Sequence, residues 1–228
     1  VTQIGTETAV LIYFAKDIWR ILGAWFGQFA HPETRGDPDV RMGWLVIIGT
    51  LPIGVLGFVF SDQIETVARN LYLVAFTLIF FGLLLGIADR TSRAIKELGQ
   101  LNVPDGLIYG LCQALALIPG VSRSGATITA GLFMGYTREA ATRYAFLLAI
   151  PAVLASGFYQ ALDISSDPTA AWGPTILATI IAFLIGYAVI AWLIRYVSTN
   201  SYMPFVIYRI TLGTLVLLLL GTGVLTSA

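Results

Sequence analysis

The 228 residues are 57% hydrophobic and only 11% charged, and thirteen Lys and Arg balance thirteen Asp and Glu. Soluble domains have about 45–50% apolar and about 25% charged residues, so the composition excludes an ordinary soluble domain. The zero net charge gives no electrostatic basis for nucleic-acid binding, and the single cysteine excludes an internal disulfide. Because a helical crossing needs about 20 apolar residues, we expect an all-α integral membrane protein with several crossings.

The first forty residues predict two helices and a loop. The apolar run over about 4–15 is too short to span a bilayer and fits the end of a longer helix. Since Val1 starts in the middle of this pattern, we expect the chain to be a fragment. Residues 16–30 are apolar at helical spacing with charges between, which predicts an interfacial helix. The polar segment 31–41 predicts a loop in which His31 is a surface residue.

Five longer apolar runs predict membrane crossings. They cover about 42–60, 71–88, 137–162, 174–197 and 204–224, joined by polar links at 61–70, 89–105 and 163–172. Pro52 and Pro151 lie inside crossings and are expected to kink them. Gly82 and Gly86 predict a face where helices pack closely. Arg209 lies near the start of the last crossing, so we expect its side chain to snorkel to the membrane interface.

Residues 106–135 differ from the other apolar stretches. Two short runs, about 106–118 and 125–135, flank the segment Pro-Gly-Val-Ser-Arg-Ser-Gly. Neither run can span a bilayer, and runs of this length are typical of re-entrant half-helices. If this pair of runs enters and leaves the membrane by the same face, the links at 16–41 and 89–105 lie on that face as well. These two links hold most of the Lys and Arg residues of the chain. The positive-inside rule then makes that face cytoplasmic.

Arg123 is the one cation that this map leaves at membrane depth. An arginine there costs about 2.5–3.5 kcal/mol on insertion scales, which makes it a candidate functional residue. Three hydroxyl residues and two glycines surround it: Ser122, Ser124, Thr127, Gly120 and Gly125. A helix that starts at this point directs free N–H groups and its positive dipole end into the same space. Guanidinium, hydroxyls and helix N-terminus together predict an anion site, and phosphate suits it best.

The residues alone leave three function classes open. An enzyme that cleaves a phosphate ester or anhydride and a carrier that moves an anion both fit half-helices meeting at membrane depth. A structural arginine that neutralises a buried carboxylate is the third. Ser122 is either a nucleophile or a hydrogen-bond donor to phosphate, and the lack of a nearby base in the sequence favours the donor. Gln113 is expected either to orient the loop or to satisfy a freed carbonyl.

The string GLCQALALIPGVSRSGAT at 110–127 resembles the signature of the undecaprenyl-diphosphate phosphatases, the bacitracin-resistance family of bacterial membranes. The likeness continues in QIGT at 3–6, FLLAIP at 146–151 and PFVIYR at 204–209. The resemblance implies hydrolysis of a polyprenyl diphosphate to the monophosphate that carries cell-wall precursors. We therefore expect two catalytic residues, Arg123 and Ser122. The substrate-binding residues expected with them are Gly120, Ser124, Gly125, Thr127 and Gln113.

The family's architecture implies two inverted repeats, each with a re-entrant helix pair, in one membrane domain. We expect 1–105 to be the remainder of the first repeat and 106–228 to be the second, with its re-entrant pair at 106–135. The family's other signature, two glutamates four residues apart followed by Pro-x-Ser-Ser-x-Gly-His, has no match here. Those glutamates are the ligands that the resemblance assigns to a Mg²⁺ or Ca²⁺ ion, so we expect this chain to carry about one half-site and no metal ligands.

The resemblance also implies a location and partners. We expect the bacterial plasma membrane, an active site that opens to the outer face, a polyprenyl diphosphate lipid as substrate and a possible homodimer. The alternative to a hydrolase is a polyprenyl-phosphate flippase or an anion transporter that uses the same arginine.

Overall fold

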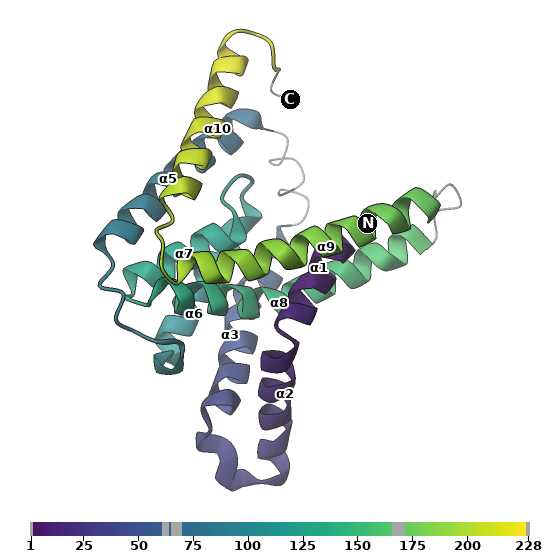
Figure 1. Ribbon diagram of the computed structural model, residues 1–228, viewed down its shortest axis with the longest axis vertical. Coiled ribbons are helices and arrows are strands. Elements are labelled where there is room, and N and C mark those ends of the chain that lie inside the picture. The colour runs from purple at the N-terminus through teal and green to yellow at the C-terminus, as the bar shows by residue number, and fades with distance from the viewer. Residues whose placement is uncertain (1, 61–63, 65–69, 166–171, 227–228) are drawn as a thin grey trace. The chain divides into compact units, whose positions relative to one another are not determined.

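The computed structural model describes residues 2–60, 64, 70–165 and 172–226, and within these ranges every regular element is a helix (Figure 1). The all-α prediction is therefore confirmed. Most of the predicted links at 61–70 and 163–172 lies outside the described residues. The chain forms two compact units.

Four helices of the described chain are long and apolar enough to cross a membrane: α3 (Pro38–Val59), α5 (Leu71–Thr91), α9 (Trp172–Val197) and α10 (Met203–Gly221). They agree with four of the five predicted crossings. The fifth is a helix as predicted, α8 (Arg138–Ser165), with Pro151 inside it, but it is not among these four. The chain is thus a multi-pass membrane protein.

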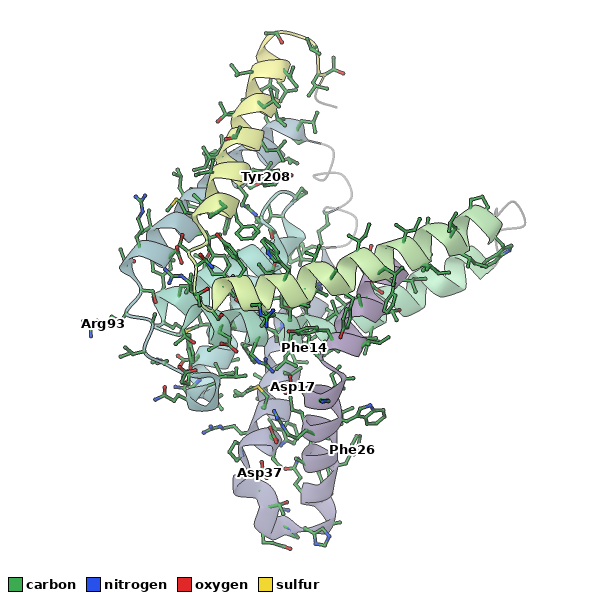
Figure 2. The ribbon with its side chains drawn as sticks, in the orientation of Figure 1. Phe14, Asp17, Phe26, Asp37, Arg93 and Tyr208 are labelled. Atoms are coloured by element: carbon green, nitrogen blue, oxygen red, sulfur yellow. The ribbon has the colours of Figure 1, made fainter. Side chains whose placement is uncertain are left out.

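The start of α3 corrects the predicted loop at 31–41. The loop holds the short 3-10 helix η1 (Pro32–Gly36), and α3 already begins at Pro38. Proline fits the first turn of a helix because its missing N–H would have no helical partner there. The carboxylate of Asp37, labelled in Figure 2, accepts a hydrogen bond from the N–H of Asp39 at 2.7 Å, which caps the helix four residues earlier than expected.

The first compact unit comprises Val1–Ile47 and Phe146–Ser198. Within it, α1 (Thr2–Tyr13) packs along α9 (Figure 1). Phe14 separates α1 from α2 (Ala15–Ala30); it is buried and stacks on Phe146 with ring centroids 5.7 Å apart. On α2, Ile21 is buried while Trp19 and Phe26 are exposed, and the location of this helix at the membrane interface stays a prediction. His31 lies on the surface, as predicted, and its Nδ1 is 3.4 Å from Oε1 of Glu33.

The second compact unit comprises Ile48–Ala145 and Thr199–Ala228, and it contains the predicted phosphate-binding segment. The helices α5 and α10 run side by side in it (Figure 1). A Cβ atom added to Gly82 would lie 3.2 Å from the Cβ of Arg209, and one added to Gly86 would lie 3.2 Å from Val206. The predicted close-packing face of these two glycines is confirmed. The repeat boundary expected at residue 105 stays a prediction.

The predicted pair of half-helices also lies in the second unit. The chain forms α6 (Val103–Ala114), the 3-10 turn η3 (Leu115–Leu117), a loop, and α7 (Arg123–Phe133). The two α-helices have 12 and 11 residues, well short of the about 20 residues of a crossing. This confirms the local structure, two short helices with a break at Pro119 and Gly120.

Asp89 ties three helices of the second unit together. Its side chain, 1% exposed, accepts hydrogen bonds from Nε of Arg138 at 2.6 Å and from the N–H of Tyr202 at 3.0 Å. The Tyr202 hydroxyl in turn contacts the hydroxyl of Thr142, and burial raises the pKa of Tyr202 well above its usual range. These contacts hold together the end of α5, the first turns of α8 and the start of α10.

Candidate phosphate-binding site

The loop between η3 and α7 has an unusual backbone. Gly120 has φ +85°, and a Cβ atom on it would lie 2.6 Å from the carbonyl oxygen of Val74 on α5. Both the conformation and the close approach therefore require glycine at this position. Two residues later, Ser122 has φ 68° and ψ 117°, a region that non-glycine residues rarely occupy. Such strain persists only where surrounding contacts enforce it, and it concentrates at functional sites.

We expect Gly120→Ala to destabilise the protein more than Gly135→Ala. Gly135 also has a positive φ, +88°, but open space around it, so alanine there costs only the backbone strain, about 1–2 kcal/mol. At Gly120 the added methyl group must also displace α5, which adds about 1–3 kcal/mol. Urea titrations of the two variants in detergent measure the difference. Equal losses would show that packing of the loop against α5 does not require glycine at position 120.

Ser122 caps the helix α7. Its Oγ accepts a hydrogen bond from the N–H of Gly125 at 3.2 Å, and its carbonyl accepts from the N–H of Ala126 at 2.9 Å. The hydroxyl is exposed, so its proton can still be donated to a ligand. The N-terminus of α7 thus starts directly at Arg123, with the positive end of the helix dipole at the loop.

Hydrogen bonds to three successive carbonyl groups hold the loop in place. The hydroxyl of Thr77 on α5 donates to the carbonyl of Pro119 at 2.6 Å. Nη2 of Arg209 on α10 donates to the carbonyls of Gly120 and Val121, at 2.8 and 3.0 Å. Carbonyls at a helix break need partners at membrane depth, because no bulk water is present to supply them. Side chains from α5 and α10 supply them here.

The expectation that Arg209 snorkels to the interface is wrong. Its side chain is only 8% exposed and lies beside the loop, because Gly82 leaves room for its stem and two carbonyls accept its protons. In Figure 2 Tyr208, the preceding residue, is labelled; it is exposed. Arg93, also labelled there, is exposed as expected for an arginine in a link. The loop therefore has two nearby arginines, Arg123 and Arg209, whereas the sequence pattern predicts only Arg123.

The structure brings most of the predicted site residues together. Arg123 is half-buried at the first position of α7, Ser122 and Ser124 flank it and are exposed, and Gly125 completes the same turn. These residues, with Gly120, form a compact set of charge, hydroxyls and approachable backbone. Such a set can bind an anion through charge-assisted hydrogen bonds.

Two predicted binding residues lie deeper. Thr127 is fully buried, and its hydroxyl donates to the carbonyls of Arg123 and Ser124, at 2.9 and 3.1 Å. Gln113 is also fully buried, with Nε2 3.5 Å from the carbonyl of Gly49 on α3. Its position beside the turn that precedes Pro52 fits the alternative that it satisfies a carbonyl. Direct substrate contact by either side chain stays a prediction.

An apolar cavity of about 570 Å³ adjoins the loop within the second unit. It is lined by Leu56, Phe60, Ile64, Leu111, Cys112, Ala114, Leu115, Leu117 and Ile118. Leu117 and Ile118 line the cavity and immediately precede Pro119 and Gly120. The cavity therefore lies directly beside the start of the polar loop. A cavity of this size and chemistry suits a hydrocarbon chain.

Comparison with known proteins identifies the family. The model of the family described as bacitracin resistance protein BacA matches residues 1–215. The chain belongs to this family. It is 60% identical to an undecaprenyl-diphosphatase of Thermobifida fusca over 226 residues, covering 99% of this chain and 77% of that protein. It is 57% identical to undecaprenyl-diphosphatase 2 of Streptomyces coelicolor over 238 residues, covering 99% and 82%. The undecaprenyl-diphosphatase of Micrococcus luteus is 57% identical over 231 residues, covering 100% and 83%.

The divalent cation expected from the resemblance does not fit the residues that the structure describes. These ranges contain no group of three or more His, Cys, Asp or Glu side chains that could hold a metal ion. The buried carboxylates of the described second unit have other partners: Asp89 pairs with Arg138, and Asp105 accepts from Tyr136 at 2.6 Å and from Lys96 at 3.4 Å.

Proposed function

We infer that this membrane protein hydrolyses undecaprenyl diphosphate to undecaprenyl phosphate and inorganic phosphate at the loop before α7. The family match over residues 1–215 and the relatives named undecaprenyl-diphosphatase support this activity. The observation that carries its location is the strained turn at Ser122, which holds the start of α7 and Arg123 beside a glycine-rich backbone. Hydrolysis at this site would recycle the lipid carrier of cell-wall synthesis and thereby give resistance to bacitracin.

The chemistry follows from charge and position. Water attacks the terminal phosphorus, the bond to the bridging oxygen breaks, and the lipid leaves as the monophosphate while a proton is released. Phosphoryl transfer depends mainly on positioning and on stabilising the charge of the transferring group. Arg123 and the N-terminus of α7 stabilise that charge, and Ser122 and Ser124 donate hydrogen bonds to its oxygens. In this proposal Ser122 acts as a donor, because its Oγ already caps the helix.

The cavity lined by Leu111, Cys112 and Ile118 provides a binding site for the first isoprene units of the lipid. It adjoins the loop, and all of its lining residues are apolar. A diphosphate held at Arg123 would place the attached hydrocarbon chain beside the loop. The cavity thus accounts for selection of a lipid over a water-soluble diphosphate.

We expect bound lipid to protect Cys112, the single cysteine of the chain, from a maleimide reagent. Undecaprenyl phosphate would slow labelling of Cys112 several-fold because its chain fills the cavity, whereas inorganic pyrophosphate, which has no chain, would not. Mass spectrometry of the labelled protein measures the rate. A Cys112→Ser, Thr91→Cys variant places the thiol at an exposed helix end and serves as the control. Equal protection of both cysteines, or of neither, would exclude binding of the lipid chain in this cavity.

The location and assembly extend the proposal. The positive-inside distribution supports a plasma-membrane protein whose links at 16–41 and 89–105 face the cytoplasm. From the family resemblance we further propose that the phosphate site opens to the outer face. We also propose that the protein forms a homodimer.

Phosphate release and lipid movement distinguish a hydrolase from a carrier. Purified protein in liposomes with undecaprenyl diphosphate is assayed for inorganic phosphate, and in parallel for transfer of undecaprenyl phosphate between leaflets. The proposal expects catalytic release of phosphate that saturates with lipid. Lipid transfer without phosphate release would contradict it and favour the carrier.

A further inference from the structure

The positive charge of Arg209 has no carboxylate partner among the described ion pairs. The side chain is 8% exposed, and only Nη2 donates to the loop carbonyls. Nε is buried and has no hydrogen-bond partner among the described atoms. The two buried carboxylates of the described second unit, Asp89 and Asp105, pair with Arg138 and Lys96 instead. A buried guanidinium is costly unless an anion balances it, which points to an anionic ligand.

The guanidinium of Arg209 lies at the first turn of α7. A Cβ atom added to Gly125 would lie 3.3 Å from Nη1 of Arg209 and 3.2 Å from Oγ of Ser122. Both distances are short for a Cβ atom, so glycine at position 125 allows the guanidinium and the capping serine to approach the first turn of α7 closely. Arg123 begins the same helical turn, and the dipole of α7 adds positive potential there. The guanidinium of Arg209 and the N-terminus of α7, whose first residue is Arg123, thus lie in one small region.

We propose that Arg209 is a second cation of the phosphate site, which binds one phosphoryl group of a diphosphate while Arg123 and the N-terminus of α7 bind the other. In this arrangement Nη2 keeps its hydrogen bonds to the carbonyls of Gly120 and Val121, and Nε and Nη1 face the ligand. The proposal rests on the proposed function for the identity of the substrate. It goes further because it assigns a residue that determines specificity for a diphosphate.

The consequence is a preference for two phosphoryl groups over one. A diphosphate uses both cations, whereas the monophosphate product uses one, so the product leaves more easily than the substrate. Guanidinium groups suit this task because their planar N–H donors bind phosphate oxygens in pairs. A cation that served only to hold the loop would lower binding of all anions alike when removed.

Binding of inorganic anions tests the proposal without requiring hydrolysis. Isothermal titration in detergent compares inorganic pyrophosphate with orthophosphate for the unchanged protein, Arg209→Gln and Arg209→Lys. We expect the unchanged protein to prefer pyrophosphate by about tenfold or more, as one extra charge-assisted contact provides. Arg209→Gln should lose this preference, and its orthophosphate affinity should fall only by the modest amount that loosening the loop causes, as in Thr77→Val. Arg209→Lys should retain part of the preference, since it keeps the charge but not the paired donors.

Thr77→Val is the matched control for loosening the loop. It removes the 2.6 Å hydrogen bond to the carbonyl of Pro119 and leaves the charge of the site unchanged. We expect it to lower the affinities for pyrophosphate and orthophosphate to the same degree, so that the ratio of the two affinities stays that of the unchanged protein. Size-exclusion chromatography verifies that each variant is folded. If Arg209→Gln fails to fold, Arg209→Lys supplies the ratio.

The outcomes separate this proposal from the proposed function. A variant of Arg209 that keeps the full preference for pyrophosphate, or that weakens both anions equally as Thr77→Val does, would overturn the role of Arg209 as a second cation. Absence of phosphate release by the unchanged protein would instead count against the hydrolase, whatever the titrations show.

Discussion

Replacing Arg123 with alanine is expected to lower phosphate release from undecaprenyl diphosphate about 100- to 1000-fold, the usual cost of removing one preorganised group that stabilises transition-state charge. Arg123 is the first residue of α7, and in the proposed mechanism its guanidinium and the helix N-terminus act on the same charge. The loss should fall mainly on kcat, because the charge on the transferring group grows in the transition state. Release of inorganic phosphate by purified variants in detergent measures it.

Three further variants define what Arg123 contributes. Arg123→Lys should recover part of the activity, since it keeps the charge but not the paired donors. Ser122→Ala and Ser124→Ala should each lose about tenfold, the scale of one hydrogen bond to a charged group. Near-normal turnover of Arg123→Ala would place the reaction elsewhere in the protein.

The largest loss of stability is expected for Asp89→Ala. Removing the buried partner of an ion pair costs up to about 3–5 kcal/mol when the other charge is left without compensation; Asp89 is 1% exposed, and Arg138 keeps 32% of its side chain exposed. Here Arg138 would lose the acceptor at 2.6 Å, and the N–H of Tyr202 would lose the one at 3.0 Å. For a chain of this size the melting temperature should fall by on the order of 10 °C. Tryptophan fluorescence during heating in detergent measures the shift.

Arg90→Ala is the matched control for this variant. Arg90 is the next residue on α5 and is exposed, so its removal should change the melting temperature by only about 1–2 °C. Asp89→Ala should also lower the stability of the loop, because Asp89 joins the helices that carry Thr77 and Arg209. Equal melting temperatures for the two variants would mean that the buried ion pair does not hold these helices together.

The sequence predicts the helices of this protein well because their lengths follow from its apolar runs. The predicted crossings over 71–88 and 204–224 correspond to α5 at Leu71–Thr91 and α10 at Met203–Gly221. The break at Pro119 and Gly120 is predictable for the same reason, since neither residue suits the interior of a helix. Candidate residues next to that break, Ser122 to Gly125, could therefore be located in the sequence.

The direction of side chains was harder to predict. Whether Arg209 points to the interface or to the loop depends on how α10 is rotated against α5, and that rotation follows from packing at Gly82 and Gly86. Nothing within α10 itself reveals it. Likewise, Thr127 lies in the motif, yet its hydroxyl turns back onto its own helix, a common alternative for threonine. The positive φ of Ser122 is unpredictable because serine rarely adopts it.

Chemical rescue tests most directly the claim that the guanidinium group of Arg123 acts on the phosphate at the start of α7. Guanidinium chloride at millimolar concentration is added to Arg123→Ala, to Ser122→Ala and to the unchanged protein, and phosphate release from undecaprenyl diphosphate is measured. The geometry predicts that guanidinium restores part of the activity of Arg123→Ala in a saturable manner and leaves the other two unchanged. A failure to rescue, in a variant shown to be folded and to bind the lipid, would contradict the claim.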